Sequence, residues 1–205
     1  MSGDGDLSPQ QGECIAAILA GGKGRRLGMN KALLEIGGKT ILDRIIEVLL
    51  DIFPSILLVV QDEEDFPHPD CGPRVEVVAD LLPEKGPLGG IYTALEYSPA
   101  PYVFVMACDM PYPSRRLIDC LLAQARGREA VVPRKGDYIE PLFAVYGRDI
   151  RGRIHTRLQK NRLKIYELIR ELDVRYLDEE EIAACDPDSR SFFNINTPQD
   201  LEQAR

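Results

Sequence analysis

The chain has 205 residues, of which 44% are hydrophobic and 28% are charged, with a formal net charge of −8. These values are ordinary for a globular protein with one substantial core. The acidic balance argues against nucleic-acid binding, which depends on clustered Lys and Arg, and the longest apolar runs are far too short to span a membrane. Residues 1–13 lack the basic and apolar regions of a signal peptide, so we expect a disordered tail before a single domain of residues 14–205.

The first predicted element is a buried strand at residues 14–20, which runs into the glycine-rich sequence LAGGKGRRLGMNK of residues 19–31. A dinucleotide fingerprint requires G-x-G-x-x-G, but Gly28 comes one residue too late after the GKG of residues 22–24, and no Walker A loop is present. Glycines still allow close approach of the backbone to an anion, and cations can neutralise it. The segment therefore favours a phosphate ligand over its alternative, a solvated basic turn.

Apolar runs and amphipathic segments alternate along the rest of the chain. Strands are predicted at residues 14–20, 56–60, 75–79, 102–107, 130–133 and 142–146. Helices are predicted at residues 40–52, 88–97 and 114–126, with one or two more in 148–172 that bury Leu163, Tyr166, Leu168 and Ile169. A last helix begins at Thr197, with Pro198 in its first turn and Asp200 near its positive end. This alternation indicates a three-layer α/β/α Rossmann-like sandwich with a mostly parallel central sheet.

The cysteines show neither a disulfide framework nor a zinc motif. Their number is odd and no C-x-x-C pair occurs, so we expect reduced thiols in a cytoplasmic protein. Cys108 lies beside a carboxylate and is a candidate catalytic thiol, but a small buried residue at a strand end is the favoured interpretation. The five cysteines stand at positions 14, 71, 108, 120 and 185.

Polar or glycine-rich sequence follows three of the predicted strands. The glycine-rich segment follows the first strand, Asp80 and then GPLGG of residues 86–90 follow residues 75–79, and Asp109 follows residues 102–107. Ligands of such sheets bind at the carboxyl ends of the strands, so these loops are expected to converge. GPLGG is either a glycine-capped turn or a backbone surface against a base or ribose. Asp109 is either a helix cap or a Mg²⁺ ligand; Ser114 is the better-placed cap, which favours the metal role.

Together these features predict displacement at a nucleotide phosphate. Mg²⁺ and the cations of the glycine-rich segment would offset charge on the triphosphate and on the departing pyrophosphate. With only two histidines, no Ser-His-Asp or Cys-His arrangement is evident, and none is needed. Catalysis would depend on positioning and electrostatics rather than on a protein nucleophile.

The motifs LAGGKGRRLGMNK, Asp80, GPLGG, CDMP, EPLFAVY and FFNINTPQDL occur in the order seen in the MobA family of molybdenum cofactor guanylyltransferases. The chain resembles that family over residues 14–205. The resemblance implies a nucleotidyltransferase of the nucleoside-diphospho-sugar transferase-like fold. It also implies transfer of GMP from GTP to molybdopterin, with release of pyrophosphate and formation of molybdopterin guanine dinucleotide.

The resemblance also implies roles for individual residues. Lys31 would contact the phosphates and, with Arg26, act in catalysis, while Asp109 would bind both nucleotide and Mg²⁺, with Asn196 as an additional candidate metal ligand. On the acceptor side we expect Arg25, Glu140, Asn194 and Asn196, although Glu140 could equally be a surface charge. The nucleotide site would comprise Leu19, Ala20, Gly21, Gly22, Lys31, Gln61, Asp80, Pro87, Leu88, Gly89 and Asp109.

The nucleotide base has one clue in the sequence. Similar enzymes that use pyrimidine nucleotides commonly have Leu-Ala-Ala-Gly where this chain has Leu19-Ala20-Gly21-Gly22, and the absent Cβ at Gly21 would make room for a purine. This favours GTP over CTP. The alternatives are a cytidylyltransferase acting on molybdopterin or another small phosphorylated acceptor, and a non-catalytic nucleotide-binding regulator. Other proteins of molybdenum cofactor biosynthesis, or enzymes that accept the cofactor, are candidate partners.

Overall fold

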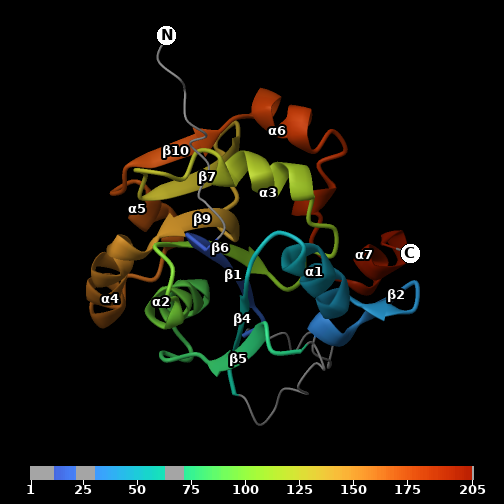
Figure 1. Ribbon diagram of the computed structural model, residues 1–205, viewed down its shortest axis with the longest axis horizontal. Coiled ribbons are helices and arrows are strands. Elements are labelled where there is room, and N and C mark those ends of the chain that lie inside the picture. Colours follow the sequence, from blue (N-terminus) through green and yellow to red (C-terminus); the bar gives the residue numbers. More distant parts are fainter. Residues whose placement is uncertain (1–11, 22–30, 63–71, 205) are drawn as a thin grey trace.

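A central sheet of eight strands organises the part of the chain that the computed structural model describes, residues 12–21, 31–62 and 72–204. The strand order is β10-β7-β9-β6-β1-β4-β5, and β8 pairs with β7 beyond this path (Figure 1). A separate two-stranded hairpin joins β2, Glu35–Ile36, to β3, Lys39–Thr40. The strands of the large sheet are β1 (Cys14–Leu19), β4 (Ile56–Val60), β5 (Val75–Ala79), β6 (Tyr102–Ala107), β7 (Ala130–Lys135), β8 (Tyr138–Ile139), β9 (Phe143–Gly147) and β10 (Val174–Leu177).

The sheet is mostly parallel, as predicted. β1 pairs in parallel with both β4 and β6, β4 pairs in parallel with β5, and β10 pairs in parallel with β7. Among the described strands of this sheet, β9 runs antiparallel between β6 and β7, and β8 runs antiparallel to β7. The carboxyl ends of β5, β4, β1, β6 and β7 therefore lie along one edge of the sheet.

Helices cover both faces of the sheet (Figure 1). One hydrophobic core lies between the sheet and α1, α3 and α6, and the other lies between the sheet and α2, α4 and α5. Alternate residues of β1 enter the two cores, because successive side chains of a strand point to opposite faces. The helices are α1 (Ile41–Leu50), α2 (Pro87–Tyr97), α3 (Arg115–Leu122), α4 (Arg151–Gln159), α5 (Ile165–Ile169), α6 (Glu179–Cys185) and α7 (Pro198–Gln203), with 3-10 turns at Lys31–Leu33 (η1), Arg148–Ile150 (η2) and Arg190–Phe192 (η3).

The predicted elements are present, but α6, β10 and the short strands β2, β3 and β8 were not predicted, and some predicted bounds differ. The strand β10 was not predicted, because its four residues, VRYL, form a short edge strand without a continuous apolar run. Residues 148–172 divide into η2, α4 and α5, and Tyr166, predicted to be buried, is 42% exposed. The third predicted helix ends at Leu122 rather than at residue 126. Thr197 caps α7 as predicted, and its hydroxyl accepts the Asp200 N–H.

The prediction of reduced cysteines is wrong for one pair. Cys120 of α3 and Cys185 at the end of α6 form a disulfide. The two residues are 65 positions apart and meet because α3 packs on α6, which cysteine spacing cannot show. Cys14 and Cys108 are free thiols. Desolvation, together with the neighbouring Asp109 carboxylate, raises the pKa of Cys108 to about 12, which supports the structural role preferred for it.

Within the described residues, none of the helices combines the length and the apolar character needed to cross a membrane.

Candidate active site

Backbone hydrogen bonds tie together the segments that follow four neighbouring parallel strands. The N–H groups of Ala20 and Asp80 donate to carbonyls at the end of β4, at 2.8 and 2.7 Å. The N–H of Cys108 donates to the carbonyl of the last residue of β1 at 3.2 Å. The ends of β1, β4, β5 and β6 are therefore held side by side, so that the loops expected to converge do so.

Lys31 joins three segments that lie far apart in the sequence. Its Nζ donates to Asp109 Oδ2 at 3.2 Å and to Asn196 Oδ1 at 2.7 Å. Lys31 begins η1, Asp109 follows β6, and Asn196 precedes the cap of α7. The side chains of Lys31 and Asp109 are 19% and 21% exposed, so their ion pair is largely shielded from water yet accessible to a ligand. Three predicted site residues thus meet at one point.

The segment that carries Asn196 is fixed in place by backbone contacts. The Ile195 N–H donates to the Asp109 carbonyl at 2.9 Å. Asp200 Oδ2 accepts the N–H groups of Asn196 and Thr197 at 2.8 and 2.7 Å. These bonds to the charged carboxylate lower the pKa of Asp200, so the clamp is retained at neutral pH. Asn194, another predicted site residue, instead uses its amide Nδ2 to donate to the Phe192 carbonyl at 3.0 Å.

The donor atoms of this cluster suit a hard cation. Asp109 Oδ2 and Asn196 Oδ1 both face the Lys31 ammonium, which is a positive group at the place where two oxygens converge. Mg²⁺ typically binds through one or two carboxylates and takes its other ligands from substrate phosphates and water. Nowhere in residues 12–21, 31–62 and 72–204 do three or more His, Cys, Asp or Glu side chains form a potential metal site.

The beginning of α2 forms a second surface of the site, beside Asp80. Asp80 Oδ1 accepts the Thr93 hydroxyl at 2.7 Å and the Leu82 N–H at 3.1 Å. Thr93 is not among the predicted site residues, because it belongs to none of the sequence motifs. A Cβ on Gly89 would lie 2.9 Å from the Leu82 carbonyl oxygen and 3.4 Å from Asp80 Oδ2. Glycine is therefore required at position 89 for α2 to approach the Asp80 loop.

The other two predicted residues of GPLGG differ in their access to a ligand. Pro87 is exposed in the first turn of α2, after Gly86, whose φ of 65° favours glycine. The Leu88 side chain is fully buried in the core beneath α2, so only the backbone of Leu88 is open to a ligand, and its assignment to the nucleotide remains a prediction. The backbone N–H of Leu88 lies in the first turn of α2, where an unpaired N–H group can bind an anion.

The residues at the end of β1 are constrained by the fold. Leu19 is buried, and its side chain packs on Gly90, where a Cβ would lie 3.2 Å from both Leu19 methyl carbons. A Cβ on Gly21 would lie 3.3 Å from the backbone nitrogen of the exposed residue Gln61. Glycine at position 21 thus has a packing reason, the close passage of this segment past the end of β4. Its predicted effect on the nucleotide base remains a prediction.

Glu140 is not a surface charge. It is 6% exposed, and its carboxylate accepts the Tyr138 hydroxyl at 2.8 Å and the Leu142 N–H at 3.3 Å. Burial raises the pKa of Glu140, while these two hydrogen bonds act in the opposite direction and the charge of Asp109 adds to the rise. Neither motif nor spacing predicted the burial of Glu140.

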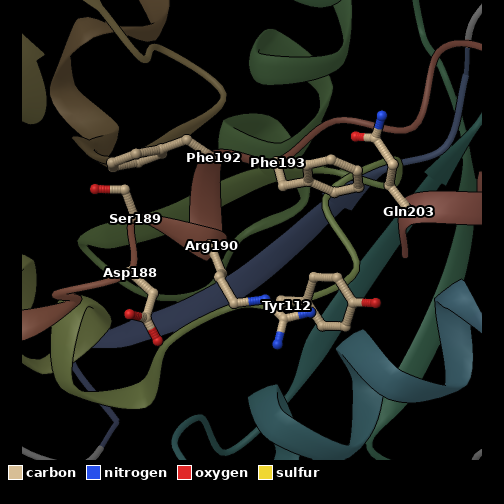
Figure 2. A pocket seen from close by; sticks show the side chains of 7 residues that line it. All are labelled: Tyr112, Asp188, Ser189, Arg190, Phe192, Phe193 and Gln203. Carbon is tan, nitrogen blue, oxygen red and sulfur yellow. The ribbon is translucent and has the colours of Figure 1, made fainter. Parts of the chain in front are cut away.

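A pocket of about 310 Å³ lies between the loop that carries Tyr112, the residues around η3 and the end of α7 (Figure 2). The Arg190 guanidinium lies 3.9 Å from the centre of the Tyr112 ring. This contact joins η3 to the loop that follows Asp109. None of the predicted site residues lines this pocket. The lining residues are Tyr112, Asp188, Ser189, Arg190, Phe192, Phe193 and Gln203.

Three predicted site residues, Gly22, Arg25 and Arg26, lie outside the described residues.

Comparisons with known proteins agree with one another. The family model described as a MobA-like NTP transferase domain matches residues 16–176. A protein of Pelotomaculum thermopropionicum named "probable molybdenum cofactor guanylyltransferase" is 36% identical over 195 residues, which are 94% of this chain and 92% of that protein. A protein of Methanosarcina acetivorans with the same name is 38% identical over 213 residues, covering 98% of this chain and 95% of that protein. The crystal structure of molybdopterin-guanine dinucleotide biosynthesis protein A from Archaeoglobus fulgidus superimposes with a TM-score of 0.80 at 30% identity, covering 92% of this chain and 95% of that one.

We expect Gly89→Ala to lower the melting temperature. The new Cβ would meet the Leu82 carbonyl oxygen at 2.9 Å and Lys85 Cβ at 3.2 Å, and the backbone atom cannot move without displacing the Asp80 loop. Overpacking of this kind costs about 1–3 kcal/mol. Thermal unfolding followed by circular dichroism measures the effect.

The matched control is Gly152→Ala, in the exposed part of α4, where an added Cβ meets nothing within 4 Å. Alanine should leave the melting temperature unchanged or raise it slightly at this second position of α4, because glycine loses more conformational freedom on folding. Equal tolerance of alanine at positions 89 and 152 would show that the approach of α2 to Asp80 does not depend on glycine.

Proposed function

Because the chain belongs to the MobA-like NTP transferase family, we propose that it transfers GMP from GTP to molybdopterin. The products are molybdopterin guanine dinucleotide and pyrophosphate, in a step of molybdenum cofactor biosynthesis. The observation that carries the proposal is the contact of the Lys31 ammonium with both Asp109 and Asn196 at the carboxyl edge of the sheet. This cluster concentrates one cation and two oxygen donors where a triphosphate and a divalent cation would meet.

The reaction forms one phosphoanhydride bond and breaks another. A terminal phosphate oxygen of molybdopterin attacks the α-phosphorus of GTP, and the bond from that phosphorus to the bridging oxygen of the β-phosphate breaks. Pyrophosphate leaves with the electron pair of the broken bond. The nucleophile is already anionic, so the protein needs to orient the two substrates and to offset charge rather than to form a covalent intermediate. The high pKa of Cys108 agrees with this, since its thiol stays protonated near neutral pH.

The residues of the cluster have distinct proposed roles. Asp109 and Asn196 would hold Mg²⁺ through their side-chain oxygens, and the bound ion would offset charge on the α-phosphate and on the departing pyrophosphate. Lys31 exchanges its contacts with these two oxygens for contacts with the phosphates. Arg25 and Arg26 are proposed as further cations, Arg26 in catalysis and Arg25 toward the acceptor. Asp200 acts through Asn196, whose backbone it holds.

Asp80, Gly21 and the start of α2 form the proposed nucleotide side of the site. Their place beside β1, β4 and β5 supports this assignment, and the names of the relatives support guanine as the base. Since the reaction uses GTP, we assign it to the cytoplasm. There the Cys120–Cys185 disulfide departs from the usual reduced state of cytosolic cysteines.

Pyrophosphate release with each of the four nucleoside triphosphates, with and without molybdopterin, tests the proposed function. We expect release with GTP and molybdopterin together, and little release when either is omitted or when CTP replaces GTP. Equal or faster release with CTP would instead identify a cytidylyltransferase. Binding of GTP without release under any of these conditions would identify a regulator.

We expect Asp109→Asn to reduce turnover by about 100-fold or more, because a positioned charged or polar group in such a site contributes about 2.7–4 kcal/mol to the transition state. The substitution keeps the size of the side chain and removes the charge that attracts Mg²⁺. The melting temperature should change little, because Lys31 keeps its hydrogen bond to Asn196. Steady-state kinetics over a range of Mg²⁺ concentrations should show partial recovery at high Mg²⁺.

Asp119→Asn is the control for this variant. Asp119 lies on α3 and pairs with Arg115 at 3.6 Å, and its side chain is 53% exposed. Its replacement should leave turnover unchanged. Wild-type turnover and wild-type Mg²⁺ dependence in Asp109→Asn would refute the proposed metal role of Asp109.

A further inference from the structure

Two exposed tyrosines have hydroxyl groups that form hydrogen bonds within the protein. Tyr138 of β8 is 55% exposed and Tyr166 of α5 is 42% exposed. The Tyr138 hydroxyl donates to the buried Glu140 carboxylate at 2.8 Å, and the Tyr166 hydroxyl donates to the Ile139 carbonyl at 3.2 Å. An exposed tyrosine usually keeps its hydroxyl in water and its ring mobile. Here the hydroxyls are anchored while large parts of the side chains remain open to solvent.

The anchoring places Tyr138 near the candidate active site. β9 pairs with β6 so that Phe143 lies opposite Met106, and the Ala107 N–H donates to the Leu142 carbonyl at 3.0 Å. Glu140 lies directly before the turn that leads into β9, next to the strand β6 that Asp109 follows. The side chain that holds the Tyr138 hydroxyl therefore stands at the same edge of the sheet as Asp109.

The hairpin of β7 and β8 extends past the carboxyl edge of the sheet. β7 runs in the direction of β6, and its last residues pair with β8, with Arg134 opposite Ile139 and Lys135 opposite Tyr138. In the strand order, this hairpin lies on one side of β6, while β1, β4 and β5 lie on the other side. Asp80 and the start of α2 belong to that other side. The β7–β8 hairpin, which carries Tyr138 and whose Ile139 carbonyl binds the Tyr166 hydroxyl, thus lies on the opposite side of β6 from the proposed nucleotide position.

We propose that Tyr138 and Tyr166 form an aromatic surface that stacks against the fused ring system of molybdopterin. This inference rests on the proposed function and assigns the acceptor to the β7–β8 side of Asp109. A flat heterocycle gains from stacking on aromatic rings, and rings that are already anchored lose little further freedom on binding. The exposed Lys135, the cross-strand neighbour of Tyr138, adds a positive charge suited to an anionic acceptor. Glu140 is a positioning residue, since it acts by holding the Tyr138 hydroxyl.

Alanine and phenylalanine variants of the two tyrosines test this inference. Tyr138→Ala and Tyr166→Ala should each raise the KM for molybdopterin by about tenfold, the effect expected from the loss of one stacking ring. The KM for GTP should stay at the wild-type value. Tyr166→Phe should retain most of the affinity, because the ring remains. Equilibrium binding of molybdopterin without GTP should show the same order of affinities.

Tyr97→Ala is the matched control. Tyr97 is 44% exposed and ends α2, about ten residues, or about 15 Å, from the glycine-rich start of that helix. Its loss should change neither KM. Melting temperatures of all variants distinguish a change in acceptor binding from a change in folding, because a purely structural role would raise the KM of both substrates or lower the melting temperature alone.

The outcomes separate this inference from the function on which it rests. If the wild-type chain makes the dinucleotide and the alanine variants at 138 and 166 behave like Tyr97→Ala, the stacking role is overturned while the function stands. If the wild-type chain releases no pyrophosphate with GTP and molybdopterin, the proposed function fails and the acceptor assignment fails with it.

Discussion

The Lys31 ammonium holds the candidate active site together by binding two oxygens from distant parts of the chain. Asp109 lies 78 positions from Lys31 in the sequence, and Asn196 lies 165 positions from it. Without a shared cation, a half-buried carboxylate would face the uncompensated cost of partial desolvation. These contacts can also be replaced when substrates bind. A divalent cation can take the place of the Lys31 ammonium at Asp109 and Asn196, and a triphosphate can take the place of the two oxygens at Lys31. The contacts of Lys31 with Asp109 and Asn196 thus resemble, in charge and position, the contacts proposed for the complex with substrates.

The rest of the fold serves to bring these segments to one edge. Ala20, Asp80 and Cys108 follow β1, β5 and β6, and backbone hydrogen bonds to the ends of β4 and β1 hold them side by side. The segment before α7 is hydrogen-bonded to the Asp109 backbone. Glycine at position 21 lets the segment after β1 pass close to the end of β4, and glycine at position 89 lets α2 approach the Asp80 loop. Both close contacts lie on the proposed nucleotide side of the site. The antiparallel strand β9 interrupts the parallel order next to β6, and this break places a different set of side chains, beginning with Glu140, on the opposite side of Asp109. The two substrates are thereby assigned to two structurally different halves of one sheet edge.

Much of this arrangement was predictable because it follows from local pattern. Asp109 stands where a buried strand ends, and Lys31 stands where a glycine-rich segment ends, so the rule for strand ends places both in the site. Other features depend on packing between distant elements, which a single sequence does not encode locally. The Cys120–Cys185 disulfide arises from the contact of α3 with α6, and the burial of Glu140 arises from the turn between β8 and β9. The complete burial of the Leu88 side chain likewise follows from the packing of α2 on the sheet.

The most direct measurement is a crystal structure of the protein with Mn²⁺ and a GTP analogue that cannot be cleaved, using the anomalous signal to locate the metal. The account predicts an anomalous peak about 2.0–2.2 Å from an Asp109 carboxylate oxygen, close to the range for small hard divalent cations. It also predicts that Lys31 Nζ leaves Asp109 and contacts a phosphate. A metal held by other side chains, with the Lys31–Asp109 ion pair unchanged beside the bound nucleotide, would contradict it.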